Sequence, residues 1–111
     1  GDGRQTRDFI SVHDVVHANL LAMQHTKPLQ GECFNVATGK SVTILEVWKR
    51  LCEIANVRLD PRFAEPRPGD IRISSASIEK IRKVLGFSPM KHFAESLRDL
   101  AKPLLGAATT K

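Results

Sequence analysis

The chain has 111 residues, which is enough for one small domain with a single hydrophobic core. Its 17 Lys and Arg against 12 Asp and Glu give a net charge of +5, which favours an anionic partner without choosing among a nucleotide, a nucleic acid and a membrane surface. Because aromatic residues are few and no nucleic-acid motif, signal peptide or transmembrane run is visible, we expect a cytoplasmic protein with no membrane partner, and nucleic acid is a disfavoured one.

The first predicted elements are a short strand and a helix. The apolar residues within 8–12 favour the strand. Asp14 is expected to cap a helix over about 14–25, because its carboxylate can accept hydrogen bonds from the free amides of the first turn.

The histidines and cysteines do not form a metal-binding pattern. His13 and His17 stand four positions apart, a spacing that superficially resembles that of zinc proteases, but no third ligand is evident. Cys33 and Cys52 lie on apolar faces without further cysteines beside them, so both are expected to be reduced core residues. We therefore expect no metal site.

The middle of the chain predicts a buried strand followed by an amphipathic helix. Residues 33–36 are strand-like. Thr43 and Glu46 form a capping box that begins a helix over about 43–55, and Asn56 is its expected end. The apolar positions of this helix recur every three or four residues: Ile44, Val47, Trp48, Leu51, Ile54 and Ala55. A strand that precedes such a helix favours an α/β layout.

A stiff basic turn follows this helix. Pro66 and Pro68 flank Arg67 and restrict its backbone to an extended conformation, and Gly69 allows a tight bend before Asp70. An arginine held in this way could bind a phosphate while the carboxylate accepts from a ribose hydroxyl. The alternative interpretation is a surface Pro-Gly turn with solvated charges.

The remaining elements are a half-buried strand and two helices. Alternating isoleucines predict the strand over 71–74, and Ser77 is expected to cap a helix over 77–85 that Gly86 ends. Phe87 is expected to fold back onto this helix.

The last helix is predicted over 92–102, because Pro103 should bend or end it. We expect residues 1–105 to form the domain and 106–111 to form a flexible tail.

Four segments in this order and spacing resemble the C-terminal part of extended short-chain dehydrogenases/reductases, and most of all the nucleotide-sugar epimerases of the UDP-glucose (UDP-galactose) 4-epimerase type. They cover nearly the whole chain. They are GDGRQTRDFISVHDV at 1–15, FNVATG at 34–39, RPGD at 67–70 and LGFSP at 85–89. The Asp14-Val15 pair is more similar to epimerases than to nucleotide-sugar dehydratases, which stay the other enzyme alternative.

The resemblance implies a fold and a set of binding roles. The fold is α/β, a C-terminal fragment of a Rossmann-type enzyme with several helices and few short strands. Arg7 and Arg67 match the family arginines that bind the diphosphate of the nucleotide sugar, Asp70 matches the acid that contacts the ribose, and Gln5 lies in the same loop. Ser77 stands where the family usually has an aspartate.

The resemblance also implies what this chain lacks. The family binds NAD in an N-terminal Gly-rich part and uses a Tyr-x-x-x-Lys pair, whereas this chain contains no tyrosine and hence no catalytic residue of that kind. The chain is then the C-terminal piece of an NAD-dependent 4-epimerase, inactive alone. Its strand near 33–36 could be left with an open edge, and self-association and a repaired small sheet are the two alternatives. The implied partners are a UDP-sugar and the missing N-terminal domain. A homodimer with a second copy stays open, because the sequence does not settle dimerisation.

A second functional class stays open. The same arginines could serve a non-enzymatic basic module that binds nucleic acid or an acidic protein. Such a module would show steep salt dependence and no preference for uridine, whereas a nucleotide-sugar site should prefer the intact UDP moiety.

Overall fold

The computed structural model describes residues 1–109 of the chain, with side chains described up to Gly106. Its elements in chain order are β1 (Thr6–Arg7), α1 (Val12–Gln24), β2 (Val42–Thr43), α2 (Ile44–Ala55), α3 (Glu79–Leu85) and α4 (Phe93–Thr109). The strands β1 and β2 pair antiparallel, with Thr6 opposite Thr43. This α/β arrangement confirms the expectation of several helices with few short strands.

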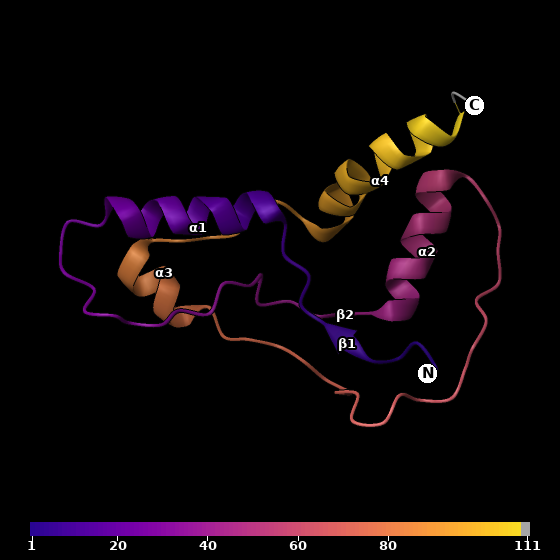
Figure 1. Cartoon of the computed structure of the whole chain (residues 1–111), viewed down its shortest axis with the longest axis horizontal. Coiled ribbons are helices and arrows are strands. Elements are labelled where there is room, and N and C mark those ends of the chain that lie inside the picture. The colour runs from indigo at the N-terminus through magenta and orange to yellow at the C-terminus, as the bar shows by residue number, and fades with distance from the viewer. Residues whose placement is uncertain (110–111) are drawn as a thin grey trace.

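The molecule is flat and open. Helices α1 and α3 lie together at one end, α2 and α4 lie at the other, and the two short strands connect them (Figure 1). The molecule measures 51 × 38 × 18 Å and its radius of gyration is 17.2 Å. A compact domain of this length would have a radius of gyration of about 13 Å. Much of the apolar surface of the helices is therefore not covered by the rest of this chain.

The buried core lies between α1 and α3. Its members are Ala18, Ala37, Ile78, Ile81, Leu85 and Phe87. Phe87 is fully buried, because Gly86 ends α3 in the left-handed conformation at φ 68° and turns the chain back onto the helix. The predicted stop and the predicted return of Phe87 are both confirmed.

The ends of α2 are also confirmed. The Thr43 hydroxyl accepts from the Glu46 amide at 3.1 Å, while the Glu46 carboxylate accepts from the Thr43 amide at 2.6 Å. The Thr43 amide and the Thr43 hydroxyl both donate to the Glu46 carboxylate, and they lower the pKa of Glu46 because they favour its charged form. At the other end, Asn56 caps the helix in the left-handed conformation.

The predicted cap of α1 is wrong by three residues. Ser11 is the cap, and its hydroxyl accepts from the His13 amide at 3.2 Å. Asp14 is only 1% exposed, and its two carboxylate oxygens accept from the amides of Met90 and Lys91 at 3.1 and 3.2 Å. Two backbone amides from a distant segment thus bind the carboxylate that the sequence pattern predicted to cap the helix.

The strands differ most from the sequence-based expectations. The first strand lies at β1 and not within 8–12, since the Asp8 carboxylate accepts from Thr38 and Gly39 and anchors the chain there. Residues 33–36 form no strand, because no described segment pairs with them, and Cys33 is exposed instead of buried. Cys52 is half-buried.

The segment 71–74 forms only an isolated parallel bridge between Thr6 and Ile73. Ile71 and Ile73 are 61% and 71% exposed, so the prediction of a half-buried strand is wrong. Alternation alone cannot show whether a second layer covers the apolar face.

The last two helices differ from the predictions at their ends. Ile78 holds the cap position of α3, and the Ser77 hydroxyl contacts only the Glu79 amide, at 3.4 Å. Helix α4 passes through Pro103 and continues to Thr109, so Gly106 to Thr109 are helical, and residues 110–111 lie outside the described part. Pro103 is tolerated because its face is exposed, where water can satisfy the carbonyl left without an amide donor.

None of the helices within residues 1–109 combines the length and apolar character needed to cross a membrane.

Candidate functional site

A small polar pocket of about 250 Å³ lies between the N-terminal loop 1–5 and the segment 63–72. Gln5, Arg67 and Asp70 line it. Arg7, the fourth predicted site residue, contacts Asp70 directly. The structure therefore brings all four predicted residues together, although 63 positions separate Arg7 from Asp70.

Backbone pairing at Thr6 explains why these distant segments meet. Thr6 donates to the Arg72 carbonyl at 2.9 Å, and its own carbonyl accepts from the Ser74 amide at 3.2 Å. On its other side, Thr6 pairs with Thr43 of β2. The residues on either side of Thr6 are thus held against the segment that carries Arg67 and Asp70.

Arg67 and Asp70 stand at the two ends of one tight turn. The Asp70 amide donates to the Arg67 carbonyl at 3.1 Å, Pro68 occupies the second position, and Gly69 has φ 77° at the third. This combination is typical of a type II turn. The bend expected from the sequence is confirmed, and the Arg67 guanidinium has no ion pair among the described residues.

The Arg7 guanidinium already donates hydrogen bonds to two neighbouring groups. One terminal nitrogen donates to the Thr6 carbonyl at 2.7 Å, and the other donates to Oδ1 of Asp70 at 2.9 Å. The Arg7 side chain is 28% exposed and that of Asp70 is 39% exposed. Both groups face solvent enough to meet a ligand.

A second ion pair, which the sequence analysis missed, also lines the pocket. Arg72 donates to both carboxylate oxygens of Asp2, at 2.8 and 3.1 Å. These hydrogen bonds, with a further one from the Arg4 amide, lower the pKa of Asp2 to about 2. The two partners are 70 positions apart, so no local sequence signal could have found the pair.

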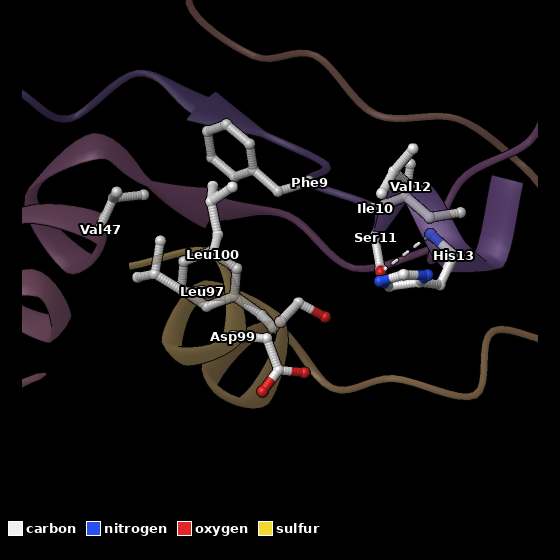
Figure 2. A pocket seen from close by; sticks show the side chains of 11 residues that line it. Phe9, Ile10, Ser11, Val12, His13, Val47, Leu97, Asp99 and Leu100 are labelled. Atoms are coloured by element: carbon white, nitrogen blue, oxygen red, sulfur yellow. Dashed lines mark hydrogen bonds between the residues drawn. The ribbon is translucent and has the colours of Figure 1, made fainter. Parts of the chain in front are cut away.

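A larger hollow of about 570 Å³ lies elsewhere, between the segment 9–13, α2 and the first turns of α4 (Figure 2). Phe9, Val47, Leu97 and Leu100 give it an apolar surface, and Ser11 and His13 are joined at its edge by the capping hydrogen bond. Since no Arg or Lys lines it, this hollow does not suit a diphosphate.

Within residues 1–109, no group of three or more His, Cys, Asp and Glu is placed to hold a metal ion. His17 instead packs beside Phe87, with ring centroids 6.2 Å apart.

The polar pocket offers binding chemistry. Arg67 and Arg72 line it, Arg7 lies beside it, and Asp2, Glu65 and Asp70 supply three carboxylates. Planar guanidinium forks match phosphate oxygens. The carboxylate of Asp70 has one oxygen, Oδ2, with no hydrogen bond among the described residues, which is available to a hydroxyl donor.

Comparison with known proteins finds relatives along nearly the whole chain. The family model described as GDP-mannose 4,6 dehydratase matches residues 1–100. A UDP-glucose 4-epimerase of Mycolicibacterium smegmatis is 35% identical over 97 residues, which cover 87% of this chain and 30% of that protein. A dTDP-glucose 4,6-dehydratase of Haemophilus influenzae is 34% identical over 115 residues, covering 92% of this chain and 33% of that protein.

Solved structures show the same similarity. The UDP-glucose 4-epimerase of Thermotoga maritima, solved with UDP-glucose, superimposes with a TM-score of 0.86 and 35% identity, covering 100% of this chain and 34% of that one. Other similar epimerase structures contain NAD. The chain spans about a third of the length of these proteins.

Proposed function

We propose that this chain, which belongs to the GDP-mannose 4,6 dehydratase family of extended short-chain dehydrogenases/reductases, binds the nucleoside-diphosphate part of a UDP-sugar as the C-terminal portion of an NAD-dependent 4-epimerase. The observation that supports the proposal most is the convergence of Gln5, Arg67 and Asp70 on one pocket, with Arg7 paired to Asp70 beside it. The similarity to an epimerase with bound UDP-glucose supports the choice of ligand.

Each side chain has a role that its surroundings suit. Arg67, which has no ion pair among the described residues, binds the diphosphate, and Arg7 adds a second fork. The free Oδ2 of Asp70 accepts from a ribose hydroxyl. Gln5 is held at the pocket wall because its backbone carbonyl accepts from the Ile44 amide at the start of α2, at 3.1 Å.

We further propose that a separate NAD-binding part covers the exposed face of α1. Val12, Val16, Leu20 and Met23 share one face of the helix and are between 45% and 80% exposed. Burying a large apolar side chain is favourable by roughly 1.5–3 kcal/mol, so this face favours a partner. The unpaired segment 33–36 offers backbone groups for a neighbouring strand.

In the complete enzyme, NAD supplies reversible hydride transfer at the sugar. The groups of this chain bind and orient the substrate, because the pocket holds arginines and carboxylates but no tyrosine for proton removal. The chain alone is therefore expected to give no epimerised product from UDP-glucose and NAD. A product formed by the chain alone would contradict this division of roles.

A nucleotide-sugar dehydratase is the second candidate for the complete enzyme, favoured by the family model and by the Haemophilus influenzae relative. The product separates the two activities: an epimerase gives the C4 epimer, whereas a dehydratase gives a 4-keto-6-deoxy sugar with loss of water.

Amide NMR titration of the chain tests the binding proposal. UDP should shift amides around Arg7, Arg67 and Asp70 and leave those of the α1–α3 core unchanged. Inorganic phosphate and an RNA oligomer serve as comparison ligands. If RNA shifts a broad basic face while UDP shifts nothing, the non-enzymatic basic module replaces the nucleotide-sugar site.

A further inference from the structure

We infer that Asp70 restrains Arg7 in the empty pocket and thereby makes the site select ligands that carry a ribose beside their phosphates over bare anions. The inference rests on the proposed function, since it deepens the specificity of that same site. It assigns Asp70 a second role in addition to contact with the ribose: it competes with phosphate for the Arg7 guanidinium.

The geometry of Arg7 is the first support. Its two terminal nitrogens each have a partner, the Thr6 carbonyl at 2.7 Å and Oδ1 of Asp70 at 2.9 Å. An anion that approaches Arg7 must therefore share these donors or displace one partner. The Thr6 carbonyl belongs to the paired backbone of β1 and is held there. Asp70 lies in the turn that starts at Arg67, so its hydrogen bond from Arg7 is the one that an anion can displace.

The charge balance of the pocket is the second support. Of the three arginines, Arg7 is paired with Asp70 and Arg72 is paired with Asp2. Only Arg67 has no ion pair within residues 1–109. The Gly1 ammonium and the Glu65 carboxylate also line the pocket, so its four positive groups exceed its three carboxylates by one. A bare anion such as pyrophosphate thus meets one net positive charge, and three nearby carboxylates oppose it.

A ribose changes this balance. When a ribose hydroxyl donates to Asp70, the carboxylate gains a new hydrogen bond, which offsets the loss of Arg7 as its donor. Arg7 is then available to the diphosphate. Pyrophosphate carries no ribose hydroxyl that could donate to Asp70. If it drew Arg7 away, the Asp70 carboxylate would lose its hydrogen bond from Arg7 and would lie beside a negatively charged ligand. The Arg7–Asp70 pair therefore penalises the wrong ligand more than the right one.

The test compares pyrophosphate and UDP as ligands of the chain and of Asp70→Asn. Removing the carboxylate charge should raise the affinity for pyrophosphate by about 2- to 5-fold, the size expected for a partly exposed ion pair. The same change should lower the affinity for UDP by about 3-fold or more, because a charged acceptor of the ribose is lost. Effects of opposite sign on the two ligands are the expected result.

Two further variants separate the restraint from a general charge effect. Asp60→Asn makes the same charge change at an exposed residue outside this pocket, in the segment that connects α2 to α3 and also carries Asp70. It should leave the pyrophosphate affinity unchanged. In an Arg7→Gln background, Asp70→Asn should raise that affinity by a clearly smaller factor, because only the general repulsion by the carboxylate is then relieved and the restrained guanidinium is absent. Dispersed amide spectra verify that each variant is folded.

The inference is overturned if Asp70→Asn fails to raise pyrophosphate affinity, or if the rise is equally large without Arg7. Failure of the proposed function looks different: UDP then binds neither the chain nor any variant more tightly than pyrophosphate does. In that case the proposed preference for ribose-containing ligands fails together with the proposed function. This holds even if the pyrophosphate affinities of the variants show that Asp70 restrains Arg7.

Discussion

Arg72 binds Asp2 through two hydrogen bonds of 2.8 and 3.1 Å, and so joins the N-terminal loop to the segment that carries Arg67 and Asp70. The pair connects the two walls of the proposed nucleotide pocket. Its donors hold the pKa of Asp2 at about 2, below its ordinary value of 3.8. A carboxyl with a lowered pKa contributes stability above its ordinary pKa, and this contribution is lost as the pH falls through about 2.

The first prediction concerns this titration. Carboxyl ¹³C NMR of the chain should show Asp2 titrating near pH 2, and in Arg72→Gln its midpoint should move up toward 3.8. Arg58 lies in the segment that connects α2 to α3 and does not contact Asp2. Arg58→Gln should therefore leave the Asp2 midpoint low. An Asp2 midpoint that does not change in Arg72→Gln would show that the ion pair does not form in solution.

The second prediction concerns the buried carboxylate of Asp14. Asp14→Ala leaves the amides of Met90 and Lys91 without their acceptor, and should lower the free energy of unfolding by about 3 kcal/mol. Urea denaturation measures the change. Asp60→Ala, at an exposed aspartate, should change stability by less than about 0.5 kcal/mol. Equal effects of the two variants would count against the Asp14 contacts.

The third prediction concerns Gly3, which has φ 74° and lies against Leu45 at the start of α2. A Cβ at position 3 would come within 2.7 Å of Leu45 Cγ. Gly3→Ala therefore combines backbone strain with a clash and should destabilise the chain by about 2–4 kcal/mol. Gly31 has nearly the same φ, 73°, with nothing within 4 Å of such a Cβ, so Gly31→Ala isolates the strain and should be milder. Thermal unfolding of the two variants gives the comparison.

The fourth prediction concerns the core. Phe87 is fully buried between α1 and α3, and Phe87→Ala should lower the free energy of unfolding by about 3–5 kcal/mol. Phe63 is 59% exposed, so Phe63→Ala should have a small effect on stability. If chemical denaturation shows no difference between them, the core is not where the structure places it.

Local sequence signals predicted the helices well. The capping box of Thr43 and Glu46 and the left-handed stop at Gly86 depend on neighbours within a few positions, so they can be recognised without a fold. The turn at Arg67 to Asp70 was predictable for the same reason, because Pro68 and Gly69 restrict the backbone directly.

Tertiary partners decided the features that the sequence analysis missed. Asp14 has the chemistry of a helix cap, but amides 76 and 77 positions away take its carboxylate. Residues 33–36 have the composition of a buried strand, but a strand needs a neighbour, and the described residues supply none. The Asp2–Arg72 pair likewise depends on contacts that only the fold creates.

The most direct test of the nucleotide-binding account is the dissociation constant for UDP of the chain, of Arg67→Gln and of Arg62→Gln. Both variants lose one arginine from the same extended segment, but Arg67 lines the pocket and Arg62 does not. The account predicts that Arg67→Gln weakens binding by about tenfold, as expected for loss of a charged hydrogen bond, while Arg62→Gln binds like the unaltered chain. Equal dissociation constants for the two variants would contradict it.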